Sequence, residues 1–324
     1  MKAKVLILAR AFRREMPAAA EPLIAAGCEV VESPEWRLLE AEELAKVITG
    51  IDACVAGNDR FTREVFPHAD RLKVISRWGI GVDAIDLAAA TEHGVVVTNT
   101  PGLTADAVAD FTFMLMLVSA RNFRRCHEVM CTGGWDEIIG VNVCRKTLGI
   151  IGFGAIGKAV ARRAQGFEMR VLAYDVRPDV EAAGALAVSL VDLGTLLRES
   201  DFVTLHASAG DESDRMMGAE QLAVMKPSSF LINTARGRLV DEEALARALA
   251  NGRIAGAAMD AHRCEPPESG YCLREAPNCI LTPHSAFNSA ETARAVNRAA
   301  AENLLAVLRG ERPAHVVNPE VLAR

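Results

Sequence analysis

The stretch Gly152-Phe153-Gly154-Ala155-Ile156-Gly157 follows an apolar run that ends at Ile151 and opens an alanine-rich stretch. This order predicts a strand, a tight turn and a helix. We expect Gly152 to make the turn, Gly154 to let the backbone approach a pyrophosphate, and Gly157 to let the helix pack closely on the strand. The N-terminus of that helix would face the phosphates. The stretch therefore predicts the phosphate-binding turn of a dinucleotide site.

A second apolar run, Val171 to Tyr174, ends at Asp175. An acidic residue about 20 residues after the glycine turn accepts hydrogen bonds from the ribose of NAD and repels the 2′-phosphate of NADP. The pattern therefore favours NAD, although the neighbouring Arg177 weakens that preference.

Apolar runs of strand length alternate with helical patterns along the whole chain, which is typical of an α/β fold with parallel sheets. Before the glycine turn, the clearest predicted strands are Val5 to Leu8, Ala53 to Ala56, Lys73 to Ser76 and Val95 to Val97. After it they are Phe202 to Leu205, Phe230 to Ile232, Ala257 to Met259 and Ile280 to Leu281.

Two long helical patterns suggest where one domain gives way to another. The segment Thr98 to Gly102 interrupts the alternation, and the apolar stretch Ala105 to Arg121 after it suits a helix buried between domains or subunits. The last helical pattern, about Ser289 to Arg309, lies beyond the final strand. We expect one domain from residues 1–98 and 288–324 and another from residues 99–287, so that the first is discontinuous in sequence.

Length, charge and cysteines fit an ordinary globular enzyme. The 324 residues are enough for two cores, and 36 basic against 42 acidic residues give a net charge of −6, without long blocks of one sign. This argues against a nucleic-acid partner. The eight cysteines show no metal-ligand spacing, and the N-terminal apolar run is too short for a signal peptide or membrane span. We expect a cytoplasmic protein with reduced thiols, no metal and no membrane partner.

Three further segments place charged residues after predicted strands, where open α/β sheets bind ligands. They contain Arg236, Glu265 and His284. Hydride transfer to a 2-oxo acid needs a donor fork for the carboxylate, a proton donor for the carbonyl, and a group that keeps this donor protonated. Guanidinium, imidazole and carboxylate match these needs. Each residue alone also has a structural explanation: Arg236 could form a surface ion pair, Glu265 could belong to a turn, and His284 could cap a loop. The presence of all three together favours catalysis.

These segments resemble those of the D-2-hydroxyacid dehydrogenase family, nearest its D-3-phosphoglycerate dehydrogenase branch, over nearly the whole chain. The resemblance implies two Rossmann-like, doubly wound parallel-sheet domains, the substrate domain being discontinuous. It implies a homodimer across the long helix, a small-molecule 2-hydroxy or 2-oxo acid substrate and a cleft that closes on it. Thr98 to Gly102 is similar to the hinge.

The resemblance also assigns roles to residues. Arg236 would bind substrate, Glu265 would relay charge and His284 would be the acid and base. Arg77, Gly79, Ile80 and Gly81 match a substrate loop whose backbone amides hold the carboxylate, to which Arg236 and His284 also contribute. Cofactor contacts are expected at Gly152, Gly154, Ala155, Ile156, Gly157, Asp175, His206, Thr234, Ala235, Arg236, Asp260 and His284.

The chain departs from the family pattern in two segments. After His206 it lacks the usual proline, and after Asp260 it reads Ala261-His262-Arg263, where we expect His262 and Arg263 to be a surface pair. Their proximity to Glu265 leaves a role in substrate choice open. Phosphate recognition would need extra cations, for which Arg60 and Arg77 are the candidates, though both also suit solvated surface positions.

The sequence thus predicts an NAD-dependent oxidoreductase acting on D-3-phosphoglycerate and 3-phosphohydroxypyruvate or a close relative. One alternative is a glyoxylate or hydroxypyruvate reductase. Another, from a different class, is an NAD(H)-sensing interaction protein like the family's corepressors. The complete catalytic set favours an enzyme.

Overall fold

The computed structural model describes residues 2–323, which form two compact units. One unit comprises the chain up to Thr104 together with the segment from Asn288 onward, and the other is Ala105–Phe287. The N-terminal segment of the first unit ends at Thr104, a few residues after the expected boundary at residue 98. The reason is that residues 99 and 100 form hydrogen bonds with other residues of the first unit. Thr100 N donates to Gly79 O at 3.0 Å, and Asn303 Nδ2 donates to Asn99 O at 3.2 Å.

The first unit is built on a five-stranded parallel sheet in the order β2-β1-β3-β4-β5. Its central strands β1, β3 and β4 are short and mostly buried, as expected when helices cover both sides. The strands are β1 (Lys4–Ile7), β2 (Glu29–Glu32), β3 (Ala53–Ala56), β4 (Val74–Arg77) and β5 (Val96–Thr98), and the helices are α1 (Arg10–Arg14), α2 (Glu21–Ala25), α3 (Ala41–Val47), α4 (Leu87–Glu92) and α12 (Ala290–Leu308).

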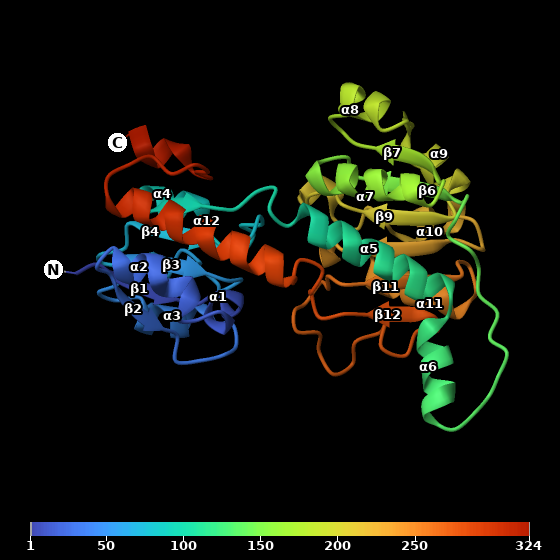
Figure 1. Cartoon of the computed structure of the whole chain (residues 1–324), viewed down its shortest axis with the longest axis horizontal. Coiled ribbons are helices and arrows are strands. Elements are labelled where there is room, and N and C mark those ends of the chain that lie inside the picture. The colour runs from blue at the N-terminus through green and yellow to red at the C-terminus, as the bar shows by residue number, and fades with distance from the viewer. Residues whose placement is uncertain (1, 324) are drawn as a thin grey trace. The chain divides into compact units, whose positions relative to one another are not determined.

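Helix α12 makes this unit discontinuous, as predicted. It begins after Ser289, whose hydroxyl caps it by accepting from Thr292 N at 3.1 Å, and it lies against β3 and β4 (Figure 1). Its buried residues include Val296 and Ala300. Ser76 Oγ on β4 donates to Ala300 O at 2.8 Å, so the helix is joined to the sheet by hydrogen bonding as well as by apolar packing.

The second unit has a seven-stranded parallel sheet in the order β12-β11-β10-β9-β6-β7-β8. The order reverses between β6 and β9, and in such sheets ligands bind where the order reverses, beyond the carboxyl ends of the strands. The strands are β6 (Thr147–Ile151), β7 (Arg170–Tyr174), β8 (Val188–Leu190), β9 (Phe202–Leu205), β10 (Phe230–Asn233), β11 (Gly256–Met259) and β12 (Cys279–Leu281).

Two apolar cores, one on each face of this sheet, hold the second unit together. Helices α5 and α7 pack on one face, and α9, α10 and α11 contribute to the other (Figure 1). The helices are α5 (Ala105–Ala120), α6 (Phe123–Cys131), α7 (Ala155–Gly166), α8 (Val180–Ala185), α9 (Leu193–Glu199), α10 (Ala219–Val224) and α11 (Glu242–Ala250). Over residues 2–323, no helix combines the length and hydropathy that crossing a membrane requires.

Candidate active site

The glycine turn joins β6 to α7 in the geometry expected of a phosphate-binding turn. Gly152 has a φ of 94°, and a Cβ there would lie 2.4 Å from Ala207 N. A Cβ on Gly157 would lie 2.2 Å from Gly152 O, so the helix can approach the turn only with glycine at this position. Gly154, the N-cap of α7, and Ala155 are exposed, which leaves the helix N-terminus accessible. The turn fits the pyrophosphate of a dinucleotide.

Asp175 follows β7 and points its carboxylate at the same turn. Its Oδ2 accepts from Phe153 N at 2.6 Å and its Oδ1 accepts from Arg177 N at 2.8 Å. Each carboxylate oxygen can accept two hydrogen bonds. Asp175 is partly exposed and retains acceptor capacity for ribose hydroxyls, so the residues fit the adenosine half of NAD.

His206 follows β9, next to the glycine turn, and its ring nitrogens have an unusual environment. Both nitrogens are buried and, among residues 2–323, neither has a hydrogen-bond partner. Burial lowers the pKa of His206 from 6.5 to about 3, so the ring is neutral at physiological pH. A buried polar group without a partner in the protein is what a bound cofactor would satisfy.

The loop after β10 carries Arg236 and is fixed by its own side chains. Asn233 at the strand end accepts from Ala235 N at 3.0 Å and donates from Nδ2 to Arg236 O at 2.8 Å. Thr234 is buried, and its hydroxyl lies 3.1 Å from that of Thr112 on α5. The Arg236 guanidinium is half-buried, with Nη1 donating to Ala235 O at 2.9 Å. Asn233 was not predicted as a site residue.

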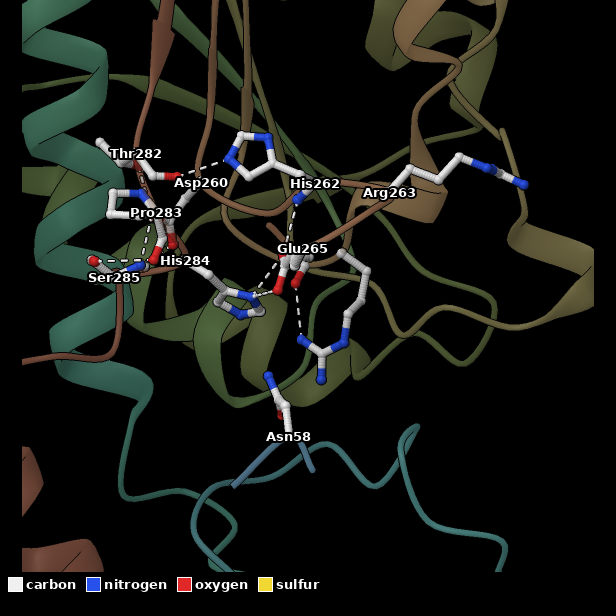
Figure 2. A network of polar contacts seen from close by, with 12 residues as sticks. Asn58, Asp260, His262, Arg263, Glu265, Thr282, Pro283, His284 and Ser285 are labelled. Carbon is white, nitrogen blue, oxygen red and sulfur yellow. Dashed lines mark hydrogen bonds and ion pairs between the residues drawn. The ribbon is translucent and has the colours of Figure 1, made fainter. Parts of the chain in front are cut away.

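His284 and Glu265, 19 residues apart in the chain, form a close pair (Figure 2). His284 Nδ1 lies 2.9 Å from Glu265 Oε1 and 2.8 Å from Oε2. Because a carboxylate accepts here, Nδ1 carries a hydrogen and Nε2 is the nitrogen left for exchanging a proton. The two side chains are 22% and 29% exposed, which shields the pair without sealing it from a substrate.

Glu265 is held as a carboxylate. Burial alone raises the pKa of Glu265, but the hydrogen bond and charge of His284, followed by the hydrogen bond from His262 N, outweigh burial and lower the pKa below its ordinary value. A negative Glu265 accepts the hydrogen on His284 Nδ1 and fixes the orientation of the ring. The pair therefore has the geometry of a general acid and base with its orienting partner.

Asp260, predicted as a cofactor contact, is fully buried and organises the His284 loop. Its Oδ1 accepts from Thr282 Oγ1 at 2.6 Å and from Ser285 N at 2.8 Å, and its Oδ2 accepts from Ala286 N at 2.9 Å. Figure 2 labels Asp260 together with its partners Thr282 and Ser285. Asp260 therefore joins the strand end of β11 to the loop after β12.

The expectation that His262 and Arg263 form a surface pair is wrong for His262. His262 is only 7% exposed, and its Nδ1 and Nε2 lie 2.9 Å from Tyr271 Oη and 2.8 Å from Thr282 O. Arg263 is exposed and forms an ion pair with Asp214 at 3.3 Å. The imidazole is buried because neighbouring elements supply partners for both nitrogens, which cannot be seen from its place in the sequence.

The predicted substrate loop lies in the first unit, after β4. Gly79 has a φ of 122°, and its N–H donates to Thr100 Oγ1 at 3.1 Å, so this amide is already used. Ile80 O accepts from Asn99 Nδ2 at 2.9 Å, which fixes the loop, and Ile80 and Gly81 provide its next amides. Arg77 donates to Trp78 O and to Asn58 Oδ1.

Residues 113–286 match the family described as D-isomer specific 2-hydroxyacid dehydrogenase, NAD binding domain. The match covers the glycine turn, Asp175 and the three residues Arg236, Glu265 and His284.

Similar proteins extend the likeness to both units. A glyoxylate reductase from Thermofilum pendens is 41% identical over 307 residues, covering 91% of this chain and 90% of that protein. A D-3-phosphoglycerate dehydrogenase from Methanocaldococcus jannaschii is 40% identical over 284 residues, covering 86% of this chain and 54% of that protein. The TT0316 protein of Thermus thermophilus superposes with a TM-score of 0.86 at 36% identity, over 97% of this chain and 99% of that one.

Proposed function

The chain belongs to the D-isomer specific 2-hydroxyacid dehydrogenase family and is an NAD-dependent oxidoreductase acting on CH–OH groups, and from this premise we propose that it reduces glyoxylate or hydroxypyruvate. The observation that carries the proposal is the His284–Glu265 pair, with Nδ1 at 2.8 Å from the carboxylate. This pair supplies the proton that reduction of a 2-oxo acid consumes.

Proton transfer is the role of His284. With a hydrogen on Nδ1 held by Glu265, a protonated ring donates from Nε2 to the substrate carbonyl oxygen as that oxygen gains charge. The hydride that adds to the carbonyl carbon would come from NADH when it is bound. The imidazole that remains is neutral, and in the reverse direction the same nitrogen takes the hydroxyl proton.

Arg236 is proposed to orient the substrate. A guanidinium holds a carboxylate or a carbonyl in fixed geometry. Asn233 fixes the backbone on which Arg236 stands, so the position of the guanidinium is set by the strand end. In the first unit, the amides of Ile80 and Gly81 are proposed to bind the substrate carboxylate, the Gly79 amide being bonded to Thr100.

The residues proposed to hold NAD are those whose local structure fits it. The glycine turn and the N-terminus of α7 would hold the pyrophosphate, and Asp175 would accept hydrogen bonds from the ribose hydroxyls. The neutral ring of His206, together with the strand-end residues Thr234 and Ala235, completes the proposed contacts.

Two arginines bear on the choice between glyoxylate and a phosphorylated substrate. Arg60 is an exposed side chain paired with Glu40 at 3.5 Å, and Arg77 is bonded to Trp78 O and Asn58. Both cations thus have partners within the protein, which supports an unphosphorylated substrate. The relative from Thermofilum pendens, named glyoxylate reductase, supports the same choice.

A second candidate substrate is 3-phosphohydroxypyruvate, the first expectation from the sequence. It is supported by the 40% identity to the relative named D-3-phosphoglycerate dehydrogenase, and it would require Arg60 and Arg77 to exchange their present partners for the phosphate. In that case Arg60→Ala and Arg77→Ala would each lower kcat/KM for the phosphorylated acid and spare glyoxylate.

The role of His284 is tested by His284→Asn, measured beside Arg236→Ala. We expect His284→Asn to lower kcat by about 100-fold or more with NADH binding intact, since general acid catalysis contributes about 10²–10⁴-fold. Arg236→Ala should chiefly raise KM for the 2-oxo acid. The matched control is His315→Asn, which changes an exposed histidine of the first unit and should leave both constants unchanged. Wild-type kcat in His284→Asn would contradict the proposal.

A further inference from the structure

The backbone at His284 is strained and therefore needs support. Its φ is 51°, in the left-handed region that L-residues other than glycine seldom occupy. Its N–H donates to Thr282 O at 3.0 Å and to Asp260 O at 2.8 Å. Conformations of this kind persist only where the surroundings determine them.

The buried ring of His262 supports this strained turn through a hydrogen bond to Thr282. Its Nε2 lies 2.8 Å from Thr282 O, the same carbonyl that accepts from His284 N. A carbonyl can only accept, so Nε2 of His262 carries a hydrogen and donates it. The imidazole therefore fixes the carbonyl on which the turn at His284 closes.

The backbone of His262 holds the other half of the catalytic pair. Its N–H donates to Glu265 Oε1 at 2.9 Å (Figure 2). The same residue thus contacts the orienting carboxylate through its main chain and the His284 loop through its ring. Glu265 and His284 are positioned relative to each other through one buried residue.

Tyr271 and Glu242 hold the ring of His262 from the far side. Tyr271 Oη lies 2.9 Å from His262 Nδ1 and 3.0 Å from Glu242 Oε1. The rings of His262 and Tyr271 pack edge to face, with centroids 5.4 Å apart. Burial and the nearby Glu242 raise the pKa of Tyr271, so its hydroxyl keeps its hydrogen and stays a neutral partner.

We propose that His262, held by Tyr271, is a positioning residue for proton transfer between the substrate and His284. It acts through its hydrogen bonds to Thr282 and Glu265. This inference rests on the proposed function of the Glu265–His284 pair.

The test is His262→Phe, which keeps a planar ring against Tyr271 and removes both ring nitrogens. With the 2-oxo acid that the wild type reduces fastest, we expect kcat to fall about tenfold or more, because small displacements of catalytic groups are costly. The dissociation constant for NADH should stay unchanged. His262→Gln, whose amide can donate to Thr282 O, should recover part of kcat.

Two more variants keep the test decisive. Arg263→Gln changes the exposed neighbour and should behave as wild type. If His262→Phe does not fold, Tyr271→Phe removes a single hydroxyl group and should show a smaller loss of kcat, again with an unchanged dissociation constant for NADH. A His262→Phe or Tyr271→Phe variant that folds and keeps the wild-type kcat overturns the proposal.

A crystal structure of His262→Phe separates this inference from the proposed function. A displaced His284 turn or a longer His284–Glu265 distance in the variant supports the inference. If the wild type reduces none of the acids tested, that result counts against the proposed function but leaves the structural result valid. An unchanged turn and distance overturns the inference.

Discussion

Single residues at the carboxyl ends of the strands carry the proposed chemistry of this protein. Glu265 and His284 form the proposed acid-base pair, Asp260 accepts hydrogen bonds from the His284 loop, and Asn233 bonds the backbone of Arg236. The charged groups of this set have partners that hold them in one orientation. Hydride transfer between a nicotinamide and a carbonyl depends on such fixed geometry, since the reacting atoms must approach within a narrow range of distances.

His206 predicts how stability depends on pH. In the folded protein burial lowers the pKa of His206 to about 3, whereas the ordinary value, expected of the unfolded chain, is 6.5. Below pH 6.5 the unfolded state therefore binds a proton that the folded state does not, and stability falls as pH decreases from 6.5 toward 3. Above pH 6.5 this contribution is constant. Urea unfolding at a series of pH values measures this dependence. Between pH 6.5 and 3, the free energy of unfolding should decrease less steeply in His206→Leu than in the wild type.

The exposed His68 provides the matched control for this measurement, because His68→Leu alters a histidine outside the fold's interior. Its pH dependence should follow that of the wild type. Parallel curves for His206→Leu and the wild type would show that His206 is not held neutral in the folded state.

The proposed catalytic residues could be selected from the sequence because each follows a strand pattern and has a type suited to one chemical task, and the structure places Glu265 and His284 in contact. The environment of His262 could not be predicted, since its partners Tyr271 and Thr282 come from later segments that only folding brings together. The use of the Gly79 amide by Thr100 was missed for the same reason.

At the scale of elements, close approach between loops brings the catalytic segments together. Gly237, at the start of the turn after Arg236, packs so closely on the β11 loop that a Cβ would lie 2.0 Å from His262 C and 2.2 Å from Arg263 N. The loop that carries Arg236 and the segment that leads to Glu265 can therefore be neighbours only if residue 237 lacks a side chain.

Gly237→Ala should destabilise the protein by about 1–3 kcal/mol, the usual cost of forcing extra atoms into a packed interior, and should also lower kcat/KM. Chemical denaturation and steady-state kinetics on the same preparation measure both effects. Gly184→Ala, in α8, is the control, because a Cβ at Gly184 meets no other atom within 4 Å. Equal stability of the Gly237→Ala and Gly184→Ala variants would contradict the packing argument.

Most elements could be predicted because their patterns are long or strongly apolar. The predicted strand Ala53 to Ala56 coincides with β3, and the stretch Ala105 to Arg121 ends within one residue of α5. Strands β2 and β8 were not predicted. Both are edge strands, and exposed or half-buried residues such as Glu29 and Ser189 interrupt the apolar pattern that marks the central strands.

At the scale of the whole molecule, an apolar surface on the second unit suggests self-association. Phe123 and Met130 on α6 are each 58% exposed, and Trp135 and Ile139 in the following segment are 87% and 88% exposed. Large apolar side chains that are this exposed within one short stretch of chain are typical of interaction sites. We propose that a second copy of the chain covers them, as the family resemblance implied for the region around α5.

Light scattering on the purified protein should give the mass of a dimer. Trp135→Glu combined with Ile139→Glu should give a monomer, because charges on an apolar interface are costly to bury. Ile24→Glu places a charge on an exposed apolar residue of the first unit and should leave the dimer intact. A monomeric wild type would exclude the proposed association.

The most direct test of the account is the rate of NADH oxidation by the purified protein with glyoxylate, hydroxypyruvate, 3-phosphohydroxypyruvate, pyruvate, phenylpyruvate and oxaloacetate, repeated with NADPH. The account predicts the highest kcat/KM with glyoxylate or hydroxypyruvate, and a preference for NADH that Asp175→Ala reduces. A clear preference for 3-phosphohydroxypyruvate that Arg60→Ala or Arg77→Ala abolishes would contradict the proposed substrate. No oxidation with any of the acids, despite measurable NADH binding, would contradict the proposed function.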